Sequence, residues 1–159
     1  MCGQARNSHA GAAAFAEGLV SFPLTLADVY AARQRVEQIA IRTPLARSTL
    51  LAERLGEGAD VRLKLEILQP SGAFKLRGAA NAILALPPEV AARGLVTCST
   101  GNHGRGVAFA ARHLGYPCAV FLSKQVPLNK VGAIRALGAH LEIAGASYAE
   151  AEQIARQWA

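Results

Sequence analysis

The sequence predicts an α/β fold built on a parallel sheet. Three short apolar runs have the length and composition of β-strands, at residues 95–98, 119–122 and 140–143. A helical pattern follows each run, and two of these patterns end at a glycine, Gly115 and Gly138. The strand–helix units recur every ~22 residues, which is typical of crossover connections between parallel strands. The units differ too much in sequence to indicate a solenoid.

Shorter elements precede this repeat. Thr25 stands before apolar residues at helical spacing, with Asp28 three positions later, a pattern typical of a helix N-terminus. We expect this helix to end before Pro44, because the residue that precedes a proline avoids the helical region. A short helix is predicted between Ser48 and Gly56, and a strand over residues 61–67.

The last two helices have clear boundary signals. Pro87 and Pro88 end one helix and begin a short one, which we expect to finish near Gly94. Ser147 and Glu150 have the spacing of a capping box, in which each side chain bonds the other's backbone N–H. The final helix is therefore predicted from Ser147 to the end of the chain.

A lysine lies where the 61–67 strand turns into a helix. Ser71 is predicted to cap that helix, which places Lys75 in its first turn. The helix dipole puts partial positive charge there, and Arg77 adds a second cation. Both effects favour the neutral amine that Schiff-base chemistry needs. Position alone is weak support, because most first-turn lysines are solvated surface residues.

A second polar stretch follows the 95–98 strand. Residues 98–104 read Cys-Ser-Thr-Gly-Asn-His-Gly. In open α/β sheets, ligands bind at the carboxyl ends of the strands, and a helix N-terminus there favours an anion. Ser99 and Asn102 add side-chain donors. A single glycine-rich β–α turn is weak support for a site, and His103 alone is compatible with a helix-cap histidine.

Residues 66–79 resemble the cofactor-lysine motif of the fold type II pyridoxal 5′-phosphate (PLP) enzymes. The motif reads Glu-x-x-Gln-x-Ser-Gly-x-Phe-Lys-x-Arg-Gly-Ala and resembles the threonine/serine dehydratase and serine racemase branch. The related cysteine synthase branch has Asp-Arg after the lysine, whereas Leu76 and Arg77 follow here. Ala73 departs from the family, which usually has serine there. The resemblance covers about residues 42–158 and implies a truncated tryptophan synthase β-like fold.

The resemblance also implies roles for individual residues. Lys75 would bind PLP covalently and remove the substrate's α-proton, and Phe74 would pack against the cofactor ring. Asn102 would contact both the cofactor and the substrate. The loop that binds the substrate carboxylate would consist of Ser99, Thr100, Asn102 and His103. The implied reaction is β-elimination from a hydroxy amino acid such as threonine or serine, which yields ammonia and a keto acid.

The same resemblance divides the chain into three regions. Residues 1–22 would be a flexible tail, residues 23–87 the N-terminal part of the larger PLP domain, and residues 88–159 most of the smaller α/β domain. Family members hold the cofactor phosphate with a later glycine-rich loop, and the pyridine nitrogen with a residue near the C-terminus. This sequence has neither feature. We therefore expect an N-terminal fragment that is inactive alone, from a parent that forms homo-oligomers.

Composition argues against several other classes. The net charge is +6, but the basic residues are spread along the chain and only 6% of residues are aromatic, so nucleic-acid binding is disfavoured. No apolar run reaches the ~18 residues of a membrane span, and we find no signal peptide. Cys2, Cys98 and Cys118 share no metal-ligand spacing with the four histidines. We predict a cytoplasmic protein with free thiols and no metal.

Three alternatives remain open on the sequence. An amino-acid racemase would need a second base on the opposite face of the cofactor, at Thr100, and threonine is a poor base. Residues 99–105, Ser-Thr-Gly-Asn-His-Gly-Arg, also resemble dehydratases assigned to hydroxyectoine breakdown. The third alternative is a truncated, non-catalytic protein that folds but binds no cofactor.

Overall fold

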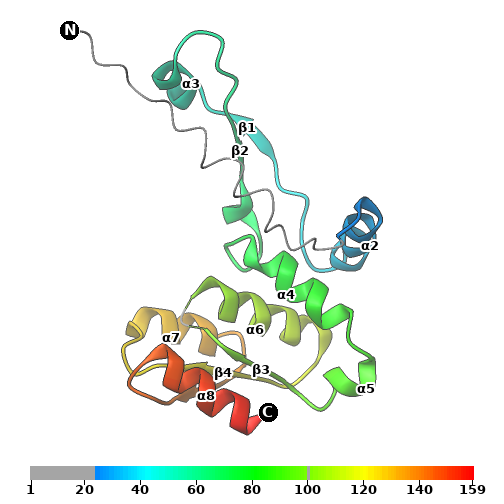
Figure 1. Cartoon of the computed structure of the whole chain (residues 1–159), viewed down its shortest axis with the longest axis vertical. Coiled ribbons are helices and arrows are strands. Elements are labelled where there is room, and N and C mark those ends of the chain that lie inside the picture. Colours follow the sequence, from blue (N-terminus) through cyan, green and yellow to red (C-terminus); the bar gives the residue numbers. More distant parts are fainter. Residues whose placement is uncertain (1–23, 100) are drawn as a thin grey trace, which may run out of the picture.

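The structure is a computed structural model that describes residues 24–99 and 101–159. It contains a parallel sheet of three strands in the order β3-β4-β5. The strands are β3 (Leu95–Cys98), β4 (Cys118–Leu122) and β5 (His140–Ile143). The predicted α/β class is confirmed, and the strand bounds agree with prediction except that β4 begins one residue earlier. Figure 1 shows this sheet in the lower part of the molecule.

Helices cover both faces of the sheet, because alternate β4 residues point in opposite directions. Val120 and Leu122 pack with α6 (Asn102–Leu114) and α7 (Leu128–Arg135) on one face. Ala119 and Phe121 pack with α8 (Tyr148–Trp158) on the other. Val120, Phe121 and Leu122 are all 0% exposed. The centre of the core is therefore β4, as expected for the middle strand of a covered parallel sheet.

A third layer lies on α6. Helix α4 (Lys75–Leu84) packs against it, and α2 (Leu26–Val36) packs against α4. Short α5 (Pro88–Ala91) leads from α4 into β3. Small side chains on both helices let α4 and α6 approach closely; the buried residues are Leu76, Ala79, Ala80, Ile83, Val107, Ala110 and Ala111. This core contains residues from both sides of the domain boundary predicted at residue 87, and that boundary stays a prediction.

Residues 45–68, here called the arm, extend away from the rest of the molecule (Figure 1). Strands β1 (Leu45–Arg47) and β2 (Arg62–Lys64) are antiparallel, and α3 (Thr49–Leu55) connects them. A 3-10 helix, η1 (Glu66–Leu68), follows β2. The arm exposes many large apolar side chains, including Leu45, Leu50, Leu55, Leu63 and Ile67. The other elements, α2, α4 to α8 and β3 to β5, are here called the body.

The predicted helix and strand limits before the sheet need two corrections. Helix α2 ends at Val36 rather than just before Pro44, because Ile39 and Ala40 turn back into the core beside α4. The strand predicted over residues 61–67 is only β2, because its partner β1 has three residues and the chain then turns into η1.

The helix caps agree with prediction at most positions. Thr25 and Asp28 form a capping box, and Ser48 caps α3. At α8, Ser147 accepts a hydrogen bond from Glu150 N, but the Glu150 carboxylate accepts from Ala146 N instead of closing the box on Ser147. Within the described residues, no helix has both the length and the apolar character that a bilayer crossing requires. The predicted tail, residues 1–22, lies outside the described part of the chain.

Candidate active site

Helix α4 begins at Lys75, later than the sequence predicts. Phe74 occupies the N-cap position and makes no side-chain capping bond. The predicted Ser71 cap is wrong: the buried Ser71 hydroxyl donates to Ala73 O at 3.3 Å instead. The reason is a turn at Gly72, whose φ of +77° lies in the left-handed region that favours glycine. This turn delays the helix and makes Lys75 its first residue.

The start of α4 lies directly against α6. Leu76 is 0% exposed. A Cβ added at Gly106 of α6 would lie 3.2 Å from the carbonyl carbon of Lys75 and 3.2 Å from Leu76 N. Only glycine permits so close an approach of one helix to the backbone of another. The lysine is therefore held beside the first half of α6, while its own side chain stays exposed.

The predicted anion loop lies at the carboxyl end of β3. Ser99 N donates to Phe121 O of the neighbouring strand, and Ser99 Oγ accepts from Gly101 N at 3.3 Å. The N-cap residue of α6 is Gly101, which has no side chain to cap the helix. Asn102 and His103 are exposed in the first turn of that helix. The first turn of this helix therefore has backbone N–H groups without an intrahelical partner, an arrangement that favours an anion. Thr100, also predicted for this loop, lies outside the described residues.

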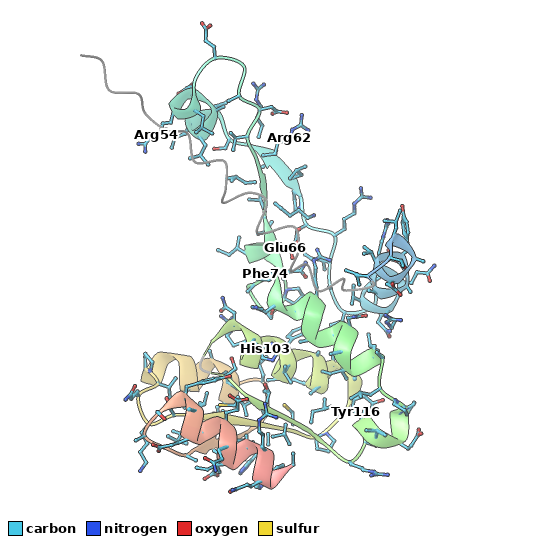
Figure 2. The ribbon with its side chains drawn as sticks, viewed as in Figure 1. Arg54, Arg62, Glu66, Phe74, His103 and Tyr116 are labelled. Atoms are coloured by element: carbon cyan, nitrogen blue, oxygen red, sulfur yellow. The ribbon has the colours of Figure 1, made fainter. Side chains whose placement is uncertain are left out.

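Lys75 and His103 come together at this site. The pKa of His103 is lowered by partial desolvation and by the positive charge of Lys75. Lys75 Nζ lies 5.0 Å from the centroid of the Phe74 ring, in a cation–π arrangement. Figure 2 labels Phe74 at the start of α4 and His103 on α6 beneath it. The structure thus brings Phe74, Lys75 and the first turn of α6 into one region, and the roles predicted for these residues stay predictions.

Arg77 does not act as the free cation that the sequence argument assumed. Its Nε donates to Glu66 Oε2 at 2.9 Å and its Nη2 donates to Glu66 Oε1 at 2.8 Å. This two-point ion pair raises the pKa of Arg77, and the Arg77 hydrogen bonds lower the pKa of Glu66 to about 2. Because the carboxylate balances the guanidinium, Arg77 gives little support for a neutral Lys75. That part of the prediction is wrong.

Sequence reasoning missed the group of residues around Glu66. Thr43 and Gln69 are each 3% exposed and donate to the Glu66 carboxylate. Glu66, Gln69 and Arg77 all belong to the motif quoted above. The motif therefore contained a carboxylate and a guanidinium on either side of a turn, which is the sequence signal for an ion pair between Glu66 and Arg77. Spacing alone could not show that they meet, because Glu66 and Arg77 are eleven positions apart with a left-handed turn between them.

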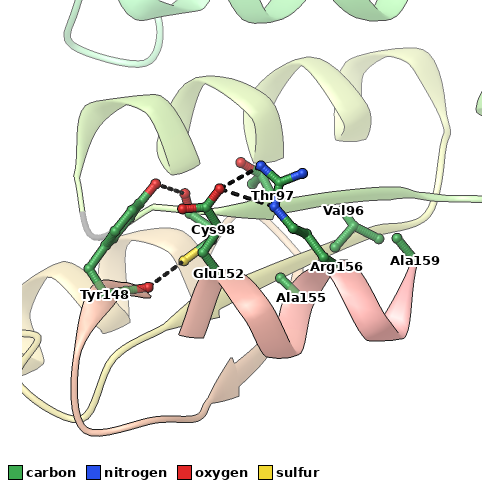
Figure 3. A pocket seen from close by; sticks show the side chains of 8 residues that line it. All are labelled: Val96, Thr97, Cys98, Tyr148, Glu152, Ala155, Arg156 and Ala159. Atoms are coloured by element: carbon green, nitrogen blue, oxygen red, sulfur yellow. Dashed lines mark hydrogen bonds and ion pairs between the residues drawn. The ribbon is translucent and has the colours of Figure 1, made fainter. Parts of the chain in front are cut away.

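A cleft of about 300 Å³ lies elsewhere, between β3 and α8 (Figure 3). It follows the edge of β3, which among the described strands pairs only with β4. Its carboxylate, Glu152, is paired with Arg156 at 2.7 Å. Burial raises the pKa of the Cys98 thiol, and Tyr148 OH donates to the carbonyl of Cys98. A paired carboxylate and a protonated thiol give this cleft no evident nucleophile or base.

The fold and the site define an α/β protein with an exposed lysine close to a helix N-terminus at the carboxyl end of a parallel sheet. The family model described as "Pyridoxal-phosphate dependent enzyme" matches residues 36–159. The chain therefore belongs to this family of PLP-dependent enzymes, as the sequence motif indicates.

The chain is similar to several dehydratases and to a racemase. A relative from Sinorhizobium fredii, assigned by name to the threonine dehydratases, is 47% identical over 81% of this chain and 38% of its own length. The L-threonine ammonia-lyase of Thermotoga maritima is 39% identical over 83% of this chain and 32% of its own length. The serine racemase of Dictyostelium discoideum superposes with a TM-score of 0.76 at 34% identity, over 84% of this chain and 43% of that one. The chain thus spans about a third of these curated relatives.

Proposed function

We propose that this chain carries the cofactor lysine and the carboxylate-binding loop of a PLP-dependent ammonia-lyase that acts on a hydroxy amino acid such as threonine or serine. One observation carries the proposal: the start of α4, with Lys75, packs against the first half of α6, whose first turn contains His103 and follows the carboxyl end of β3. Similarity to threonine ammonia-lyases supports the reaction class. The whole enzyme's activity is part of the proposal, because the chain matches only 38% and 32% of the length of these relatives.

The described residues fit the reactive side of PLP. Lys75 offers an exposed primary amine, and the 59%-exposed ring of Phe74 offers an aromatic face beside it. Asn102 offers a side-chain amide in the first turn of α6, where the helix dipole also favours negative charge. When bound, PLP supplies an electron sink that stabilises negative charge at the substrate's α-carbon. Lys75 would hold the cofactor, and Phe74 and Asn102 would contact its ring.

The side chains at this site can each take one role in the reaction. Lys75 Nζ would be the base that accepts the α-proton. Ser99 and Asn102, with the free N–H groups of α6, bind the substrate carboxylate and orient the α-carbon. The lowered pKa of His103 keeps its imidazole neutral near pH 7, so His103 contributes a hydrogen bond to the carboxylate rather than a charge. The outcome is removal of the α-proton on the side where Lys75 lies.

Covalent labelling tests the role of Lys75 without requiring turnover. The purified chain is incubated with PLP, reduced with borohydride and digested, and the labelled peptides are quantified. We expect most of the label on Lys75, because its amine lies beside Phe74 and donors suited to the cofactor. Lys124→Ala should leave this distribution unchanged, and Lys75→Ala should remove most of the label. An even distribution over Lys64, Lys75, Lys124 and Lys130 would contradict the proposal.

A racemase remains the second candidate, because solved serine racemases are similar to the chain. Both reactions would use Lys75, but racemisation also needs a second base, and Thr100 is the residue that the sequence places there. That residue lies outside the described part of the chain. Threonine lacks a readily titrating group, so the dehydratase is the better supported reaction.

A further inference from the structure

We infer that Glu66 is a positioning residue that sets the direction of Lys75. The inference rests on the proposed function, because it assigns to Glu66 the task of aiming the cofactor lysine. Glu66 lies at the base of the arm and Lys75 at the start of α4, and Figure 2 shows Glu66 and Phe74 where the arm meets the body. The inference depends on contacts within the described residues and on no bound group.

Both oxygens of the Glu66 carboxylate are fully engaged. Oε1 accepts from Thr43 Oγ1 and from Arg77 Nη2, and Oε2 accepts from Arg77 Nε and from Gln69 Nε2. The Glu66 side chain is only 16% exposed. An ionised carboxylate is acceptor-only, whereas an amide at this position would turn two of its own hydrogens toward donors. The arrangement therefore requires a carboxylate.

The same group of residues joins three segments of backbone. Gln69 Oε1 accepts from Ile41 N at 3.1 Å, and Gln69 Nε2 donates to Ile41 O at 2.8 Å. Arg77 Nη2 also donates to Ile41 O, at 2.9 Å. The segment before β1, the turn after η1 and the first turn of α4 are thus held in one arrangement with Glu66 at its centre.

Lys75 depends on this arrangement because nothing local caps its helix. The N-cap residue Phe74 makes no side-chain bond, so the entry angle of α4 is left to longer-range contacts. On one side, Leu76 is fully buried against Gly106 of α6. On the other side, Arg77 is tied to Glu66. With Leu76 and Arg77 held in this way, the backbone at Lys75 is fixed, and the lysine charge stays close enough to lower the pKa of His103.

The pKa of His103 reports the position of Lys75 without any cofactor. Lys75 lowers this pKa, so displacement of Lys75 should raise it. Removing the negative charge of Glu66 has the opposite direct effect, because fewer nearby negative charges disfavour the imidazolium. A rise in the His103 pKa of Glu66→Gln therefore cannot come from the lost charge itself. Because desolvation also lowers this pKa, a rise at unchanged burial of His103 shows that the lysine has moved away.

The test is an NMR titration of His103 in the full 159-residue chain. We expect Lys75→Met to raise the His103 pKa, and Glu66→Gln to raise it in the same direction. Arg77→Lys keeps the charge but loses the two-point geometry, and should give a smaller rise. Glu53→Gln, which replaces an exposed carboxylate of α3, is the matched control and should leave the pKa of His103 unchanged.

A second readout separates this inference from the proposed function. In the borohydride experiment, Glu66→Gln should lower the share of label on Lys75 relative to Lys124 at least twofold. If Lys75→Met raises the His103 pKa while folded Glu66→Gln and Arg77→Lys leave it unchanged or lower it, Glu66 is not a positioning residue. If the titration behaves as expected but Lys75 is never the preferred site of labelling, the positioning holds and the proposed function fails.

Discussion

The body and the arm have equally clear secondary structure but differ sharply in burial. In the body, Leu76, Phe121 and Ile134 are 0% exposed. In the arm, Leu50, Leu55 and Ile67 are 61–75% exposed, although α3 has a serine N-cap and a glycine at its C-terminus. The difference shows that caps and turn residues can define an element locally, whereas burial requires a partner layer, which the arm lacks within the described chain.

The contrast leads to the prediction with the largest effect, which concerns leucines in the two regions. Leu76→Ala should reduce the free energy of unfolding by ~2–5 kcal/mol, because it leaves a cavity between α4 and α6. Leu55→Ala makes the same chemical change at a side chain that is 73% exposed, and should stay within about 0.5 kcal/mol. Urea unfolding of both variants beside the parent chain measures the two values. Similar losses would mean that the arm is buried in solution, as by association between copies.

The body could be predicted from the sequence because its signals are local and repeated. Strands β3 and β5 begin and end where the apolar runs do, and α6 ends at Gly115, whose φ is +75°. The arm was predicted less well. The sequence predicted a strand over residues 61–67, but only β2 forms. The length of this strand is set by the three residues of its partner β1, and not by the apolar character of residues 61–67. A strand is stable only when it pairs with a partner strand, and the hydrophobic pattern of one segment gives no information about the length of that partner.

The site shows the same division between local and long-range information. The sequence placed Lys75 in the first turn of one helix and residues 98–104 at the N-terminus of another, and the structure places both helix starts near each other. What the sequence could not show is contact between residues far apart. The Glu66–Arg77 pair and the approach of Gly106 to Lys75 both depend on the fold, so the environment of the lysine amine was only partly predicted.

A second prediction compares two helical glycines of the body. Gly106→Ala places a Cβ 3.2 Å from backbone atoms of Lys75 and Leu76, which cannot rotate away, so α4 and α6 must separate. We expect a loss of ~1–3 kcal/mol in unfolding free energy. Gly132→Ala in α7 meets nothing within 4 Å and should stabilise the chain by up to ~1 kcal/mol through helix propensity.

Thermal and urea unfolding of these two glycine variants measure whether each substitution lowers or raises the free energy of unfolding. Opposite signs would show that Gly106 is required for contact between the helices rather than for flexibility. If Gly106→Ala were as stable as the parent, the lysine helix would not lie against α6 as described, and the close approach of Lys75 to His103 would lose its support.

The last and smallest prediction concerns acid and the junction of the two regions. The pKa of Glu66 is lowered from 4.5 to about 2 by the Arg77 hydrogen bonds, with help from Thr43 and Gln69. Because the pKa in the folded state lies below the unfolded value, this stabilisation is complete above pH ~4.5 and is lost as the pH falls toward 2. With the side chain 16% exposed, we expect about 1–2 kcal/mol.

Comparison with Glu66→Gln isolates this contribution, because glutamine does not titrate. The parent should be more stable than Glu66→Gln near neutral pH, and the gap should narrow steadily between pH ~4.5 and ~2. The effect should also be unequal between the regions. Protonation of Glu66 releases the arm from α4 but leaves the packing of β4 intact, so amide exchange in β1 and β2 should accelerate at a pH where Val120 and Phe121 remain protected. Simultaneous loss of protection in arm and body would show that they unfold as one cooperative unit, and that the junction at Glu66 does not separate them.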